Sequence, residues 1–115
     1  MSARGESTLT VADTEYRILF TNRAIAEAES AMGKSVIAAV RDPGVGDVAQ
    51  MLAAGLEAAR RDGATGRRAY TIQDAYRVMD EVGFAGAAKA VLEAVAAVLA
   101  YNGGAEADSA ESPNP

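Results

Sequence analysis

In the stretch RILFTNRAIAEAESAMG, the spacing of apolar residues changes from every second position to every third or fourth. Up to Phe20 the apolar side chains alternate, as on a half-buried strand, and after Thr21 they recur at helical spacing. Thr21 is a favourable N-cap, and Phe20 and Ile25 then occupy the two positions of a hydrophobic staple. The pattern predicts a strand that runs directly into a helix over residues 22–32, which Gly33 ends.

Two strands are expected ahead of this corner. Residues 7–11 and 15–20 both alternate between apolar and polar side chains, and residues 12–14 would join them. The joining sequence Ala-Asp-Thr lacks the Asn-Gly or Asp-Gly signal of the tightest hairpins, so we expect a slightly longer turn. Because a two-stranded ribbon is marginal on its own, its apolar face needs to be covered by helices.

Further helical segments follow the first helix. Ser35 can cap a short helix, and Asp47 begins a longer amphipathic one that Gly63 ends. Thr71 and Asp74 form an approximate capping box for the next helix. An alanine-rich helix over about residues 86–101 completes the pattern. The expected fold class is mostly α with a small N-terminal β-hairpin (α+β): two short antiparallel strands followed by four or five helices.

The length of 115 residues suits one domain with a modest core. Residues 1–6 are polar, and we expect a flexible N-terminus there. Residues 7–101 would form the single domain of hairpin and helices. Residues 102–115 contain Gly, Pro, Ser and acidic residues without an apolar period, which predicts a disordered acidic tail.

Composition excludes several function classes. The net charge of −5 disfavours binding to nucleic acid, since an acidic chain repels the phosphate backbone. The sequence contains no Cys and no His, so it lacks thiolate ligands, the commonest metal ligand and the commonest general base near neutral pH. No apolar run approaches the roughly 20 residues of a membrane span, and MSARGESTL is too polar for a signal peptide. We expect neither a nucleic-acid nor a membrane partner.

Four arginines bracket a loop that contains glycine: Arg60, Arg61, Arg67 and Arg68. Functionally, they could form a basic patch for phosphate or for an acidic partner. Structurally, the first two would complement the negative end of a helix dipole and the other two would solvate the loop. Stacking aromatic residues are missing between them, so the structural interpretation is favoured.

No catalytic set is expected. Glu27 with Glu29, and Asp80 with Glu81, are the nearest approach to paired carboxylates, but neighbouring positions on a helix point in different directions. The serines have no histidine to activate them. The glycines of DPGVGDVAQM lack the remaining residues of a P-loop or a dinucleotide fingerprint. The chain is therefore predicted to be no enzyme, with no catalytic, cofactor-binding or metal-binding residue and no cofactor.

The aromatic residues and the last helix are the remaining candidates. Tyrosines can pack in a core with a polar tip or anchor a protein interface, and the core is favoured for the group of Tyr70, Tyr76, Phe84 and Tyr101. Phe84 would plug the corner between two helices. A helix that is apolar on several sides is either central or shared with a partner. The candidate partner-binding residues are Tyr70, Tyr76, Val91, Val95 and Val98.

With its elements in this order, the chain resembles the tail assembly chaperones of long-tailed bacteriophages and gene transfer agents. The segments that carry the resemblance are YRILFTNRAIAEAESAMGKS, DVAQMLAAGLEAARR and YTIQDAYRVMDEVGFAGAAKAVLEAVAAVLA. Together they span about residues 7–101. The positions that match the family's patterns for its first helix and for a later segment are Asn22, Ile25, Glu29, Gly33, Thr71, Ala75 and Gly83.

The resemblance implies a non-enzymatic role in virion assembly. Such proteins bind the tape measure protein in the cytoplasm of the host bacterium, keep it soluble while the tail tube assembles, and are absent from the mature virion. It also implies possible self-association and a longer form made by programmed frameshifting near the end of the reading frame. The alternative is a virion structural component of the tail, such as a tail tube or tail completion protein, although tube proteins are usually dominated by β-sheet.

Overall fold

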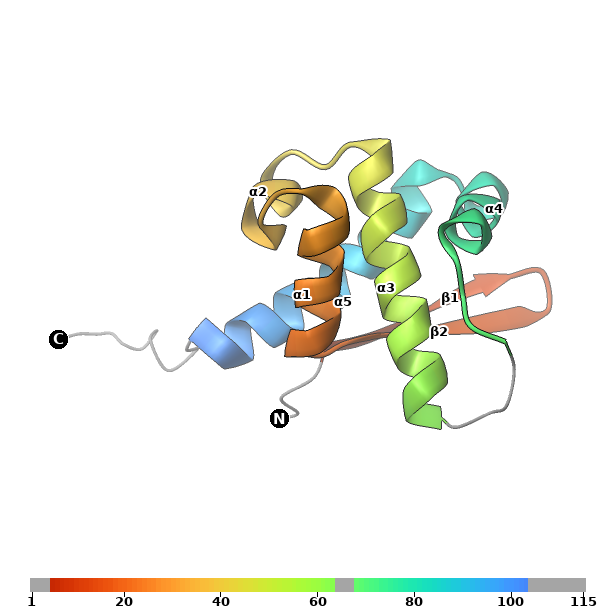
Figure 1. Ribbon diagram of the computed structural model, residues 1–115. Helices are drawn as coiled ribbons and strands as arrows, with labels where there is room; N and C mark the ends of the chain where they lie inside the picture. Colours follow the sequence, from red (N-terminus) through yellow and green to blue (C-terminus); the bar gives the residue numbers. More distant parts are fainter. Residues whose placement is uncertain (1–4, 64–67, 104–115) are drawn as a thin grey trace, which may run out of the picture.

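The computed structural model describes residues 5–63 and 68–103, and it confirms the α+β class (Figure 1). An antiparallel hairpin comes first, and five helices follow within the described residues. The elements are β1 (Gly5–Val11), β2 (Thr14–Phe20), α1 (Asn22–Met32), α2 (Val36–Arg41), α3 (Val45–Gly63), α4 (Ile72–Val82) and α5 (Phe84–Gly103).

The hairpin turn is tighter than the sequence predicts. Val11 pairs with Thr14, so only Ala12 and Asp13 connect the strands, and the expectation of a longer turn was wrong. Ala12 has a φ of 53°, the left-handed conformation that a two-residue hairpin turn requires. Alanine adopts this conformation without the usual glycine or asparagine, which is why the turn could not be recognised from its residue types.

The ordered domain is longer than predicted at both ends. Gly5 pairs with Phe20 and Glu6 with Leu19, so β1 begins inside the segment expected to be flexible. At the other end, α5 extends to Gly103, and the Asn102 side chain donates a hydrogen bond to Oδ1 of Asn22 at 2.6 Å. The rest of the predicted flexible N-terminus and acidic tail, residues 1–4 and 104–115, lies outside the described residues.

The helix caps agree with the sequence. At the strand-to-helix corner, Oγ1 of Thr21 accepts a hydrogen bond from Ala24 N–H at 3.1 Å, and both residues of the predicted staple, Phe20 and Ile25, are buried. The helix ends at Gly33, whose φ is 73°. The capping box at the start of α4 is complete, because the side chains of Thr71 and Asp74 each accept a backbone hydrogen bond from the other.

The start of α3 differs from the prediction. The helix begins at Val45, and Val48 N–H bonds to the carbonyl oxygen of Gly44, so Asp47 is the third helical residue and not the N-cap. The Asp47 carboxylate accepts hydrogen bonds from Gly44 N–H at 3.0 Å and from Nζ of Lys34 at 3.2 Å. These contacts, the first above all, lower the pKa of Asp47. The positive end of α3 is thus occupied by its own carboxylate.

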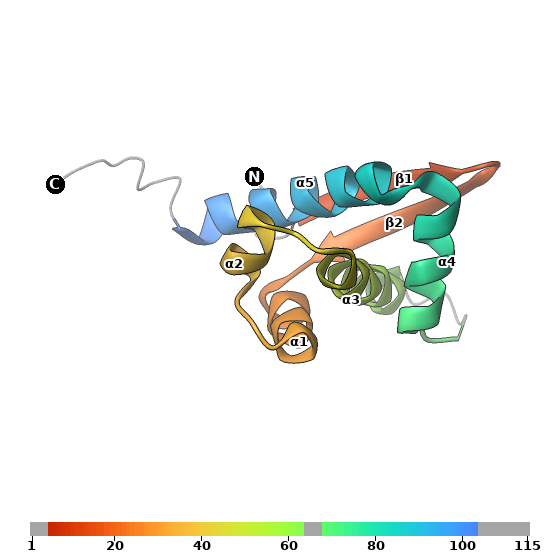
Figure 2. The same ribbon diagram turned by 90° about the horizontal axis from the view of Figure 1, so that it is seen from above.

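The hairpin lies between α3, which packs on β2, and α5, which runs along β1 (Figure 2). Glycine permits both close contacts. A Cβ on Gly55 of α3 would lie 2.7 Å from Cγ2 of Ile18, and a Cβ on Gly5 of β1 would lie 1.7 Å from the carbonyl oxygen of Ala94 in α5. The Ser7 hydroxyl of β1 also donates to the Ala90 carbonyl of α5 at 2.7 Å. Alanines and glycines therefore bring backbones together where larger side chains would separate them.

Helix α5 is more apolar than the sequence analysis allowed. Its segment Phe84–Asn102 has a mean hydropathy of 1.6 and meets the length and composition of a membrane span, so the expectation that no apolar run approaches one was wrong. Core helices meet the same criterion. In this fold Val91, Val95 and Val98 of the helix are fully buried, and packing inside the domain accounts for them.

Candidate interaction site

The structure separates the predicted partner-binding residues into two groups. Val91, Val95 and Val98 have no exposed surface, because they face β1 and the domain interior. These valines are therefore part of the core in this conformation and offer nothing to a partner. Tyr70 is half-buried and Tyr76 is exposed, so the two tyrosines are the accessible members of the predicted set.

The expectation that the aromatic group packs in the core was wrong for three of its members. Tyr76, Phe84 and Tyr101 are 38%, 40% and 45% exposed. The buried face of α4 is made by Ala75, Val78 and Met79, which turns Tyr76 outwards. Phe84 begins α5 directly after Gly83 and stays exposed instead of plugging the corner. Exposed aromatic side chains of this kind are enriched at protein interfaces.

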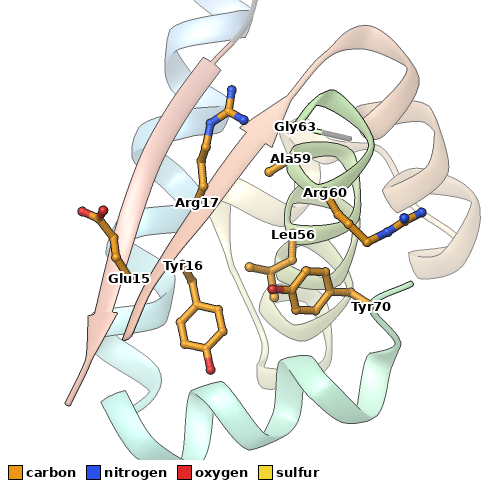
Figure 3. A pocket seen from close by; sticks show the side chains of 8 residues that line it. All are labelled: Glu15, Tyr16, Arg17, Leu56, Ala59, Arg60, Gly63 and Tyr70. Atoms are coloured by element: carbon orange, nitrogen blue, oxygen red, sulfur yellow. The ribbon is translucent and has the colours of Figure 1, made fainter. Parts of the chain in front are cut away.

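A hollow of about 380 Å³ lies where β2, the second half of α3 and the residues ahead of α4 meet (Figure 3). Leu56 and Ala59 of α3 are buried beside it, and Tyr16 of β2 and Tyr70 contribute aromatic rings. Figure 3 shows these two rings on opposite sides of Leu56, with charged side chains around them. The complete lining is Glu15, Tyr16, Arg17, Leu56, Ala59, Arg60, Gly63 and Tyr70.

Arg17 lines one side of the hollow and forms two ion pairs. Its Nη2 lies 2.6 Å from Oε2 of Glu6 on β1 and 2.8 Å from Oδ2 of Asp62 at the end of α3. The hydrogen bonds to these carboxylates raise the pKa of Arg17, that to Glu6 most. Because the three side chains are about one-third or more exposed, the pairs contribute little to stability and mainly fix the arginine in place.

On the side of the hollow opposite Arg17, Glu57 connects two lining residues, Arg60 and Tyr70. Its Oε1 accepts hydrogen bonds from Nε of Arg60 at 2.9 Å and from the backbone N–H of Tyr70 at 2.8 Å. These contacts lower the pKa of Glu57 from 4.5 to about 2, and the hydrogen bond from Arg60 is the largest cause. The carboxylate thereby holds Tyr70, which lines the hollow, against α3.

Asp74 is the one buried charged residue of the described chain. Its carboxylate accepts two hydrogen bonds from Arg68, at 2.9 and 3.1 Å, and one from Arg77 at 3.0 Å, besides closing the capping box with Thr71. The arginine hydrogen bonds and the backbone N–H of Thr71 hold the pKa of Asp74 far below its ordinary value. This network fixes the start of α4 next to Tyr70.

The arginine loop is not a free basic patch in the part that the structure describes. Arg60 pairs with Glu57, Arg61 with Glu27 and Glu57, and Arg68 with Asp74. Arg67, the fourth member of the predicted patch, lies outside the described residues. The three described arginines thus each have a carboxylate partner within the domain, which favours the structural interpretation of this cluster over phosphate binding.

Glu27, Glu29 and Ser35, which were considered for chemistry, have structural contacts. Glu27 pairs with Arg23, and Glu29 accepts a hydrogen bond from Val36 N–H at 2.8 Å, ahead of α2. The Ser35 hydroxyl caps α2 by accepting from Ala38 N–H. Among residues 5–63 and 68–103, no group of three or more acidic, histidine or cysteine side chains could hold a metal ion.

Comparison with known proteins finds no family model, no curated protein and no solved structure that matches this chain. The hollow and its contacts are therefore the main structural evidence for function. Sequence reasoning identified Tyr70 but missed Tyr16, Arg17 and Glu57. No local signal marks Glu57, because its contact with Tyr70 joins residues 13 positions apart across the end of a helix.

Proposed function

We propose that the chain is a non-enzymatic tail assembly chaperone of a long-tailed bacteriophage or gene transfer agent. In this proposal it binds and solubilises the tape measure protein in the host bacterial cytoplasm during tail morphogenesis, and it is absent from the mature virion. The support from the sequence is the order of its elements, a hairpin, a capped first helix and an alanine-rich last helix, in which the family's patterns recur.

The observation that carries the proposal is the hollow beside Tyr70. Its lining combines buried apolar side chains with two tyrosines, and exposed Tyr76 follows on α4. An amphipathic helix, such as a tape measure protein would offer, docks by inserting apolar side chains into a cavity of this kind while its polar face stays in water. Tyrosine suits the contact because its ring is apolar and its hydroxyl forms hydrogen bonds.

Two general properties agree with a holdase. The net charge of −5 helps keep a complex with an aggregation-prone partner in solution. Many copies would have to line one long partner, so weak binding at each site suffices when many sites act together. A frameshifted longer form would extend the chain beyond α5 without interrupting any described element.

The first test is an affinity purification of the tagged chain from infected or induced cells, with mass spectrometry of the proteins that co-purify. The proposal expects a very long helical protein in the eluate and no copy of the chain in purified particles. Finding the chain in finished particles at a fixed stoichiometry would instead favour the alternative, a virion structural component such as a tail tube or tail completion protein.

A second test asks whether the long partner binds at the hollow and α4. Tyr70→Ala and Tyr76→Ala should each weaken co-purification of the long partner several-fold, because aromatic anchors carry a large share of interface energy. Tyr101→Ala is the control, since Tyr101 is an exposed tyrosine like Tyr76 (45% against 38%) but belongs to the last turn of α5. Equal loss of binding in all three variants would show that the hollow and α4 are not the binding region.

A further inference from the structure

Helix α5 has a second face that the domain leaves uncovered. One face packs against β1 and α3, whereas the other lies on the outside of the domain (Figure 2). Small and apolar side chains dominate this outer face. Its exposed residues, between the aromatic residues at the two ends, are Ala85, Lys89, Glu93, Ala96, Ala97 and Ala100.

Lys89 and Glu93 are the only charged residues of α5, and they stand four residues apart on this outer face. Within residues 5–63 and 68–103, neither side chain is part of an ion pair. Their order along the helix, Lys before Glu, is the less favourable one for a pair within a single helix. Both charges are thus available to a partner that presents the opposite charges at the same spacing.

A second copy of α5, packed antiparallel, presents that pattern. When the two-fold axis passes between the two charged residues, Lys89 of each copy faces Glu93 of the other, so one contact is made twice. The flanking positions also match, because Ala85 then faces Ala97 of the second copy and Gly86 faces its Ala96. These small side chains allow the helix axes to approach to about 8 Å. A parallel pair would instead set like charges against each other.

We propose that the outer face of α5 is a homodimer surface, on which two copies pack antiparallel and exchange two Lys89–Glu93 ion pairs. A helix of 20 residues is about 30 Å long, so a single helix-to-helix contact lies at the small end of protein interfaces. The dimer is accordingly weak and reversible, with a dissociation constant on the order of micromolar. The surface is separate from the hollow, whose lining contains no residue of α5.

The test is sedimentation of the purified full chain over a range of concentrations at low salt, for the wild type, Lys89→Glu, Glu93→Lys and the double variant with both changes. Each single variant sets like charges against each other in the dimer, and its dissociation constant should rise about tenfold or more. The double variant restores opposite charges and should return to within about threefold of the wild-type value. An equimolar mixture of the two single variants should dimerise more tightly than either does alone.

Matched controls separate this contact from the effect of net charge. Arg41→Glu on α2 changes the net charge as Lys89→Glu does, and Asp80→Lys on α4 changes it as Glu93→Lys does; both positions are exposed. The controls should leave the dissociation constant within about threefold of the wild type, and circular dichroism checks the helix content of every variant. A wild-type chain that stays monomeric at about 1 mM, single variants that equal their controls, or a double variant that stays as weak as the singles would each overturn the proposal.

Discussion

The Glu57 carboxylate accepts a hydrogen bond from the backbone N–H of Tyr70 at 2.8 Å, which ties the last turns of α3 to the segment ahead of α4. The same side chain holds Arg60, and both Arg60 and Tyr70 line the hollow. One carboxylate therefore positions two lining residues of the candidate interaction site. Because this contact joins Tyr70 to α3 over 13 positions of the chain, substitution of Glu57 tests how far the carboxylate stabilises the site.

We expect Glu57→Ala to lower the free energy of unfolding by about 2 kcal/mol, since it removes the acceptor of one backbone hydrogen bond and of a charge-assisted one. Urea unfolding followed by circular dichroism measures the change. Glu81→Ala, an exposed acidic position on α4, is the control and should shift the value by less than about 0.5 kcal/mol. Equal effects of the two substitutions would contradict the anchoring role of Glu57.

Acid should destabilise the domain through Glu57 and Asp74. Both carboxyl groups have a lower pKa in the folded chain than in the unfolded one, from ordinary values of 4.5 and 3.8. The unfolded chain therefore binds more protons as the pH falls, so this stabilisation is complete above about pH 5 and is lost on acidification through the folded pKa values, that of Glu57 being about 2.

The measurement is the urea midpoint at about pH 7, 4 and 3. The variant Glu57→Gln with Asp74→Asn starts from a lower stability at neutral pH, but its midpoint should change less over the same range. A variant whose midpoint falls as steeply as that of the wild type would show that other carboxylates control the acid response.

Asp74→Ala should cost about 2–3 kcal/mol of stability, because it removes the Asp74 half of the α4 capping box together with the hydrogen bonds from Arg68 and Arg77. Thermal and urea unfolding both report the loss. The control is Asp80→Ala, exposed on the same helix, which should be nearly neutral. A small effect at Asp74 would mean that the two arginines, each about three-fifths exposed, are held by water as well as by the carboxylate.

Short-range features of the fold could be predicted from the sequence. The Thr21 cap, the Gly33 terminus and the Thr71–Asp74 capping box each involve residues within a few positions of one another, and residue type alone decides them. Which face of α4 is buried could not be predicted in the same way. Large side chains favour a buried face through Tyr76, but the close approach of neighbouring helices selects the face of Ala75 and leaves the tyrosine outside.

The candidate site was predictable only in part. Tyr70 and Tyr76 stood out as aromatic residues of a chain with few of them, but the hollow depends on contacts between distant segments, such as Arg17 with Asp62. For the valines of α5, the sequence left two interpretations open. An all-round apolar helix is consistent with a core or an interface, and only the packing of α5 on β1 assigns Val91, Val95 and Val98 to the core.

The contact of β1 with α5 can be tested by adding one methyl group. A Cβ on Gly5 would lie 1.7 Å from the carbonyl oxygen of Ala94, and since this atom belongs to the backbone of α5, the helix itself would have to move. We expect Gly5→Ala to lower the free energy of unfolding by about 3 kcal/mol, at the upper end of the usual cost of overpacking.

Gly46→Ala provides the matched control with the opposite sign. Gly46 lies in the first turn of α3, and beyond its chain neighbours and the local helix backbone no atom would lie within 4 Å of an added Cβ. Alanine has the higher helix propensity and restricts the unfolded chain, so this substitution should raise the free energy of unfolding by about 0.5 kcal/mol. Urea unfolding of the two variants and the wild type under the same conditions measures both changes in the free energy of unfolding. If Gly5→Ala is as stable as the wild type, α5 cannot lie as close to β1 as the structure places it, and the burial of its three valines would have to be reconsidered.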